Sequence, residues 1–140
     1  MNRKWFSIAA VLTAAMVLLS LSNCARSRKL VSIAVTPPGT NITLTGFGQV
    51  VGTQFTALGT YIHPPESRDI TSQAVWTTDS PSIITMDPSQ PGLVNTTGTG
   101  CGTNLGVTAS VYSDPANPSA GSVVVGTTTI NVSFSSGTCP

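Results

Sequence analysis

The chain has 140 residues, enough for one domain once its N-terminus is set aside, and only 8% of them are charged. Threonine is abundant beside 13 glycines and 10 prolines, a composition that favours short strands joined by turns. Five of the six basic residues precede residue 30, and after it one base, Arg68, stands against five acids. This balance lacks the basic footprint on which nucleic-acid binding depends, so we expect no nucleic-acid partner.

The first 23 residues have the order of a secretory signal. Arg3 and Lys4 precede a long apolar run. The run ends in the sequence LSNC, which resembles the lipobox of bacterial lipoproteins and departs from it at Asn23, where a small residue is usual. That resemblance implies cleavage before Cys24 and attachment of diacylglycerol to its thiol. We therefore expect a lipoprotein-type signal peptide over 1–23, lipidation of Cys24 and a tether over 24–29.

Two alternatives for this segment remain open. Ordinary signal peptidase could cut after Ser22 and release a secreted or periplasmic protein. An uncleaved segment would instead be a membrane anchor at the short end of the spanning range. The basic cluster of Arg26, Arg28 and Lys29 resists translocation in all three cases. Each alternative still implies export.

Short stretches of alternating apolar residues follow, separated by proline and glycine. No helical period of 3.6 residues occurs after the signal. The predicted strands cover residues 30–36, 41–45, 53–61, 71–79, 83–86, 93–96, 105–111 and 122–134. Seven or eight short strands spaced by turns predict an all-β domain over 30–140, folded as a β-sandwich, with loops at 62–69 and 113–121.

Several motifs occur in the order seen in bacterial immunoglobulin-like domains of group 2. They are Asp69-Ile70-Thr71, Trp76-Thr77-Thr78, Gly92-Leu93-Val94 and Thr108-Ala109. The resemblance covers residues 30–134 and departs from the pattern at 62–67 and in the long loop 113–121. It implies an immunoglobulin-like β-sandwich of about seven strands, of the kind found in surface adhesins and other envelope proteins.

The two cysteines of the folded part are expected to form a disulfide. Export places Cys101 and Cys139 in an oxidising compartment. A bridge between them closes a loop of about 38 residues, which the chain-entropy model values at ~4 kcal/mol. A metal site would need more ligands than these two thiols and His63 provide.

The sequence offers little for catalysis, and we expect neither catalytic residues nor a cofactor. His63 is the only imidazole and lies between prolines in a loop, so we expect it to be solvated. Asp69 and Asp79 could form a carboxylate pair, but short oxygens at these places more often close turns. The glycine-rich stretch 98–106 matches the spacing of neither nucleotide-binding motif, G-x-G-x-x-G or G-x-x-x-x-G-K-[ST]. A predicted strand also follows it where both motifs require a helix.

A sugar-binding or calcium-binding module is the alternative to a purely structural role for the remaining polar and aromatic groups. An exposed Trp76 could stack on a sugar, whereas a buried one fills the core, which we expect. Asp79, Asp87 and Asp114 lie in turns that could converge on calcium, although we predict no metal. Arg68 is expected to form a surface ion pair with Glu66, Asp69 or Asp79.

These expectations predict a non-catalytic, exported module of a bacterial cell envelope, bound to the membrane through its N-terminal lipid. It would serve adhesion and binding, or act as a structural spacer. Loops 62–69 and 113–121 or a sheet edge would contact a protein or glycan partner. A small secreted hydrolase acting through His63 is the least favoured alternative.

Overall fold

The computed structural model describes residues 28–114, 118–119 and 121–139. The predicted signal peptide, the lipidation site Cys24 and the tether up to residue 27 lie outside these residues. Within the described ranges every regular element is a β-strand. No helix in that part of the chain is long and apolar enough to cross a membrane.

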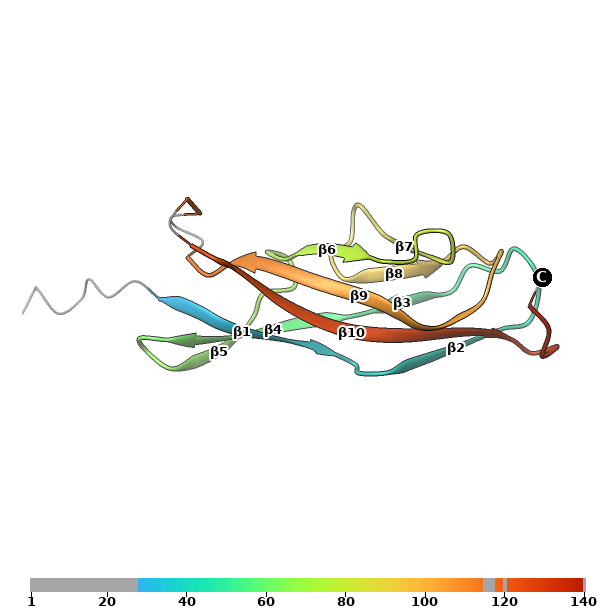
Figure 1. The fold of residues 1–140 in the computed structure, drawn as a ribbon, viewed down its shortest axis with the longest axis horizontal. Helices are drawn as coiled ribbons and strands as arrows, with labels where there is room; N and C mark the ends of the chain where they lie inside the picture. Colours follow the sequence, from blue (N-terminus) through green and yellow to red (C-terminus); the bar gives the residue numbers. More distant parts are fainter. Residues whose placement is uncertain (1–27, 115–117, 120, 140) are drawn as a thin grey trace, which may run out of the picture.

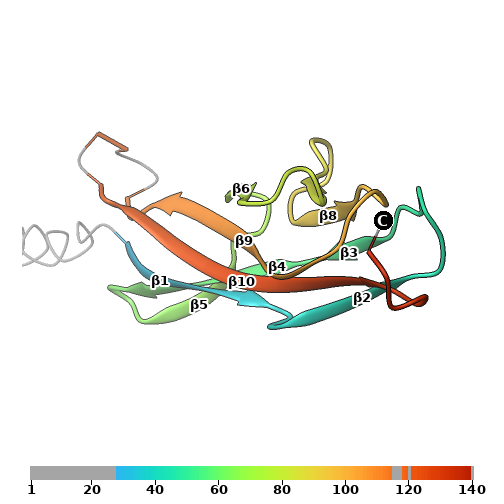
Figure 2. The same ribbon diagram turned by 45° about the vertical axis from the view of Figure 1, so that its right-hand side comes forward.

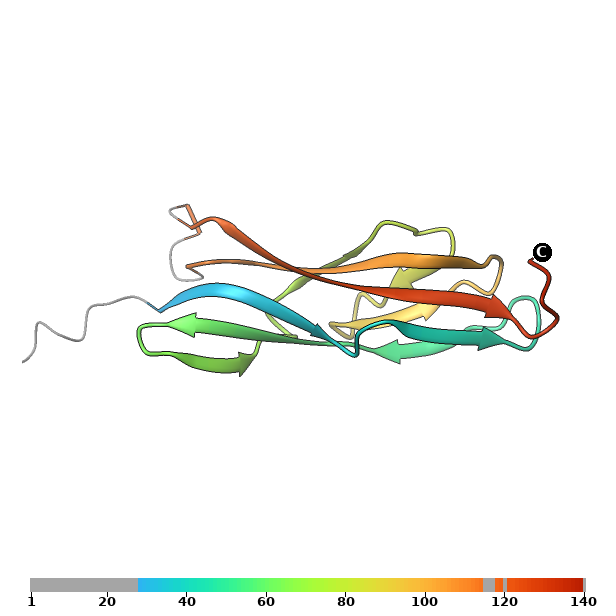
Figure 3. The ribbon, with the colours of Figure 1, turned by 60° about the horizontal axis from the view of Figure 1, so that its bottom comes forward.

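Ten strands build the described part of the chain, and the predicted all-β sandwich is confirmed (Figure 1). In order they are β1 (Lys29–Thr36), β2 (Thr40–Leu44), β3 (Gly52–Gln54), β4 (Thr56–Ile62), β5 (Glu66–Asp69), β6 (Val75–Thr78), β7 (Ile84–Met86), β8 (Leu93–Thr96), β9 (Gly102–Tyr112) and β10 (Val123–Phe134). They pair in three sheets, with orders β1-β4-β5, β3-β8-β7 and β2-β10-β9-β6. In Figure 3 the blue and green strands β1, β4 and β5 lie below the orange and red strands β9 and β10.

Strands β1 and β2 belong to different sheets although only Pro37, Pro38 and Gly39 separate them. Proline has no backbone N–H for a ladder, so the chain leaves the first sheet there. β1 pairs antiparallel with β4, whereas β2 pairs parallel with β10. The Thr128 hydroxyl of β10 donates to the carbonyl of Pro37 at 3.2 Å. This bond holds the segment between β1 and β2 against the four-stranded sheet β2-β10-β9-β6.

The sheets β1-β4-β5 and β2-β10-β9-β6 approach each other closely at Gly126 in β10. A Cβ atom at this position would lie 2.6 Å from the carbonyl oxygen of Ile33 in β1. Glycine is therefore required sterically, and any side chain would force β1 away from β10.

The hydrophobic core lies between the layers and draws side chains from nearly every strand. Phe55 is the largest fully buried side chain, placed in the single residue between β3 and β4. The expectation that Trp76 fills the core holds only in part, because it is half-buried and packs against the cluster from its margin. The fully enclosed members also include Leu30, Leu44, Ile70, Ile84, Val94, Val107 and Ile130.

The structure departs most from the predicted strands in three stretches, and the other strand ends differ by no more than three residues. The stretch 53–61 is split at Phe55, whose N–H donates to the carbonyl of Gly92 at 2.8 Å instead of continuing one ladder. Residues 66–69, expected to be loop, form β5 beside β4. Residues 71–74 form a turn rather than the beginning of a strand, with the N–H groups of Gln73 and Ala74 both donating to the carbonyl of Ile70.

The predicted disulfide between Cys101 and Cys139 is present, with the two Cα atoms 5.8 Å apart. It joins the residue before β9 to the segment that follows β10. Figures 1 and 2 place this end of the chain opposite the beginning of β1 along the long axis. The bridge therefore holds the C-terminal segment against the sandwich.

Candidate binding face on strands β6, β9 and β10

The carboxylates that sequence reasoning considered for catalysis are engaged in separate turns. Asp69 accepts a hydrogen bond from the N–H of Thr71 at 2.8 Å. Asp79 accepts from the Ser80 hydroxyl at 2.7 Å and from the N–H of Gly106 at 2.9 Å, an approach that any side chain at Gly106 would block. The predicted turn-closing role of Asp69 is confirmed.

These hydrogen bonds keep the carboxyl groups ionised. The hydroxyl and N–H of Thr71 lower the pKa of Asp69, and the Ser80 hydroxyl together with the N–H of Gly106 lowers that of Asp79. A general acid needs a pKa raised towards neutrality, and both shifts run in the opposite direction. The arrangement therefore gives neither group the properties of a catalytic acid.

Asp87 has the same kind of role between β7 and β8. Its Oδ1 atom accepts from the N–H and the hydroxyl of Ser89 and from the N–H of Gln90. The Ser89 hydroxyl is the main cause of its lowered pKa. Over the described residues no three His, Cys, Asp or Glu side chains gather where they could hold a metal ion. Asp79 and Asp87 are thus not brought together with a third ligand.

His63 lies in the tight turn between β4 and β5, with an exposed side chain and a φ of 64°. The prediction that it is solvated is confirmed. Its neighbour Glu66 forms ion pairs with Arg28 at 3.1 Å and with Arg68 at 3.8 Å. The predicted surface pairing of Arg68 is therefore also confirmed, with Glu66 as the partner.

The indole of Trp76 is tied into the sandwich. Its Nε1–H donates to the carbonyl of Thr71 at 2.9 Å, and the Thr71 hydroxyl accepts from the N–H of Ala57. The sugar-stacking role considered for Trp76 needs an exposed ring, and this half-buried, hydrogen-bonded ring does not provide one.

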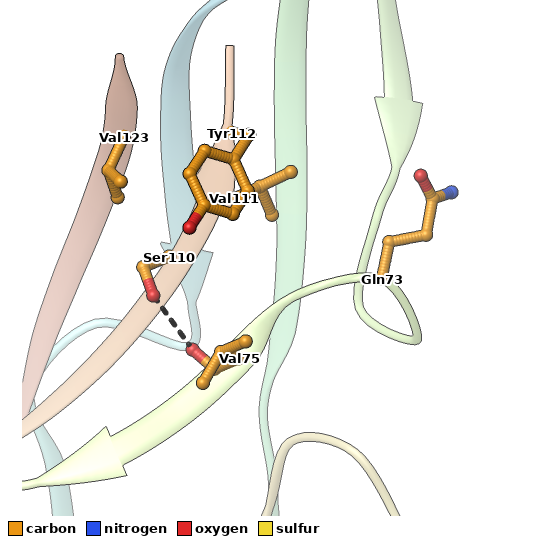
Figure 4. A pocket seen from close by; sticks show the side chains of 6 residues that line it. All are labelled: Gln73, Val75, Ser110, Val111, Tyr112 and Val123. Carbon is orange, nitrogen blue, oxygen red and sulfur yellow. Dashed lines mark hydrogen bonds between the residues drawn. The ribbon is translucent and has the colours of Figure 1, made fainter. Parts of the chain in front are cut away.

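A shallow depression of about 380 Å³ opens at the start of β6 (Figure 4). β6 begins at Val75, opposite Ser110 of β9, whereas β9 continues to Tyr112. The preceding turn 71–74 carries the chain away from β9, and this leaves a step in the sheet. Gln73, Val75, Ser110, Val111, Tyr112 and Val123 line the depression.

Four large apolar side chains around this step are exposed. Val75 is 65% exposed, Tyr112 48%, and Val123 and Val125 53% each. The register places Val75, Ser110 and Val125 in one cross-strand row, and Tyr112 opposite Val123 in the next. Because strand residues alternate between faces, these side chains point outwards, whereas Val107, Ala109 and Val111 of β9 point into the core.

A row of threonines continues the same surface along the strands. Thr77, Thr108 and Thr127 lie directly opposite one another on β6, β9 and β10. The hydrogen bonds of the described residues do not include their hydroxyls, in contrast to the bonded hydroxyl of Thr71. We call the combined surface the outer face. It consists of Gln73, Val75, Thr77, Thr108, Ser110, Tyr112, Val123, Val125 and Thr127.

Sequence reasoning missed the outer face, although a signal for it was present. The stretch SVVVG at 122–126 has valines at both parities, so at least one of them had to face away from the core. The expected binding loops are less suited to the role. β5 reduces the loop 62–69 to three residues, and the loop 113–121 is described only in part.

Neither a protein-family model nor a curated protein matches the chain. The resemblance to group-2 immunoglobulin-like domains therefore remains a prediction from the motifs.

Proposed function

We propose that this chain is a non-catalytic, exported binding module of a bacterial cell envelope, with an immunoglobulin-like fold of the group-2 type and a lipid anchor on Cys24. The signal-like N-terminus and the lipobox-like sequence before Cys24 support export and anchoring. The disulfide supports the same compartment, because such bridges persist where the surroundings are oxidising.

The outer face is the observation that carries the binding role. Large exposed apolar patches on soluble domains commonly mark interaction sites. Here Val75, Tyr112, Val123 and Val125 gather around a depression on a sheet that is held on its other side by the core. A purely structural spacer has no need of such a surface.

The position of the tether determines how this face would be presented. Cys24 precedes Arg28 by four residues, which span at most about 14 Å when fully extended. Arg28 is paired with Glu66, so this end of the sandwich, with the β4–β5 turn, would lie next to the membrane. The outer face would then run along the side of the module. Its Tyr112 end would be the end nearer the membrane, because the N–H of Leu30 donates to the carbonyl of Ser113 at 2.9 Å.

Mass spectrometry of protein from the membrane fraction tests the anchor. We expect an N-terminal peptide that begins at Cys24 and carries the mass of diacylglycerol. The Cys24→Ala variant should leave the membrane fraction or keep its signal peptide. A free N-terminus at Asn23 in the wild-type protein would contradict the proposal.

A further inference from the structure

We propose that the outer face binds a neutral oligosaccharide, lying along β9, with Tyr112 as its stacking platform. This inference deepens the proposed function and depends on it for the site. The ligand would belong to one chemical class, uncharged glycan chains.

The apolar part of the face suits the C–H surface of a sugar ring. The Tyr112 ring is about half exposed and lies opposite Val123, with Val75 across the depression (Figure 4). An aromatic ring has an extended apolar surface and, in tyrosine, a polar hydroxyl at its tip. A sugar presents the matching pair of features, apolar C–H groups and hydroxyls at the rim.

The polar part of the face offers groups for those hydroxyls. Gln73 is exposed at the edge of the depression and carries both a donor and an acceptor. The Ser110 hydroxyl donates to the carbonyl of Val75 at 3.3 Å, which leaves its lone pairs to accept. The hydroxyls of Thr77 and Thr108 are not used within the described structure, and the stiff χ1 of threonine holds them in place. Ligand sites typically combine such a few fixed polar groups with an apolar lining.

The absence of charge on the face determines the kind of glycan. None of its nine residues is ionisable at neutral pH. The carboxylates that follow its strands in the sequence, Asp79 after Thr77 and Asp114 after Tyr112, are both negative, and Asp79 is held by Ser80 and Gly106. The described basic side chains, Arg28, Lys29 and Arg68, belong to β1, β5 and the segment before β1. A phosphate, sulfate or uronate group would find no counter-ion on the face, whereas a neutral sugar needs none.

The extent of the face favours a chain of sugars over a single one. Thr108 and Tyr112 are four residues apart on β9, or about 14 Å along a strand. β9 is paired on both sides, with β6 and β10, so this line of groups is held rigidly before a ligand arrives. Rigid presentation lowers the entropic cost of binding.

Isothermal titration calorimetry on the full-length chain tests this inference. The protein is kept in a zwitterionic detergent without sugar headgroups. The probes are neutral hexasaccharides of glucose, mannose and N-acetylglucosamine, with a hexamer of galacturonic acid as the charged control. We expect binding of at least one neutral probe and no binding of the charged one.

Three variants locate the site. Tyr112→Ala should weaken binding about tenfold, the effect of losing one good aromatic contact. Thr108→Val keeps the shape of the side chain and should weaken binding severalfold. Phe47→Ala removes another exposed aromatic, 72% exposed in the segment between β2 and β3, and should leave binding unchanged.

The inference is overturned if no neutral probe binds, if the charged hexamer binds as well, or if Phe47→Ala weakens binding as much as Tyr112→Ala. The mass of the N-terminal peptide separates this failure from a failure of the proposed function. Diacylglycerol on Cys24 without glycan binding overturns the inference and leaves the proposed anchored module in place. An N-terminal peptide without diacylglycerol contradicts the proposed lipid anchor, whatever result the titration gives.

Discussion

The two faces of strands β9 and β10 differ in burial, although both carry many β-branched residues. On the inner face Val107, Ala109 and Ile130 are completely enclosed by the opposite layer. On the outer face Tyr112 and Val125 stand half exposed, and no other part of the described chain covers them. The exposed large apolar side chains of these two strands, Tyr112, Val123 and Val125, therefore gather at one step in the sheet.

Substitutions in the two faces of β10 should give the largest contrast. Ile130→Ala should lower the free energy of unfolding by about 2–5 kcal/mol, because it leaves a cavity in a fully buried site. Val125→Ala, on the outer face of the same strand, should change it by less than about 0.5 kcal/mol. Urea denaturation of both variants measures the difference. Equal losses would show that the outer face is covered by the chain itself.

The disulfide should have the next largest effect. Replacing both Cys101 and Cys139 by serine should lower the free energy of unfolding by about 2–4 kcal/mol, since the open chain gains entropy in the unfolded state. Reducing the wild-type protein should reproduce the loss, and the reductant should have no effect on the double variant. A reduced wild-type protein as stable as the oxidised one would contradict a structural role for the bridge.

Threonines with and without internal hydrogen bonds sharpen the comparison further. Thr71→Val should cost about 1–3 kcal/mol, because the N–H of buried Ala57 loses its acceptor. Thr108→Val should be close to neutral for stability, because its hydroxyl has no partner in the described structure. Thermal or urea unfolding of the two variants gives both values. A destabilised Thr108→Val protein would mean that this hydroxyl is already engaged, and hence not free for a ligand.

The smallest effect should appear in the pH dependence of stability. The pKa values of Asp69, Asp79 and Asp87 are lowered in the folded protein, so folding favours their ionised forms. Their contribution is present above about pH 4 and is lost as the pH falls through the lowered values. The urea midpoint should therefore decline as the pH falls below about 4. Asp87→Asn should make that decline shallower, and an unchanged slope would show that this carboxyl titrates alike in both states.

Local features of this chain could be predicted from its sequence, whereas features set by strand pairing could not. The turn closed by Asp69 and the crossing at Pro37 follow from the chemistry of a few adjacent residues. β5 was missed because all four residues from Glu66 to Asp69 are polar, so no apolar alternation marks them as a strand. The step at Val75 depends on a turn without glycine or proline and on the register with β9, a partner far along the chain.

The outer face was hidden for the same reason. Its rows join residues from β6, β9 and β10, and each strand alone contributes no more than two large apolar side chains to it. The disulfide could be predicted, because export implies an oxidising compartment and the folded part has just two cysteines, too few for a metal site. The half-buried position of Trp76 depends on where β6 lies at the edge of its sheet, which periodicity does not determine.

Amide chemical-shift mapping during titration with the neutral hexasaccharide that binds best tests the outer face most directly. We expect the shift changes to be confined to β6, β9 and β10, with the largest at Ser110 and Tyr112 and none at the β4–β5 turn around His63. Changes centred on that turn, or on the segment of Phe47, would show that the module binds with its loops and that the outer face is not its site.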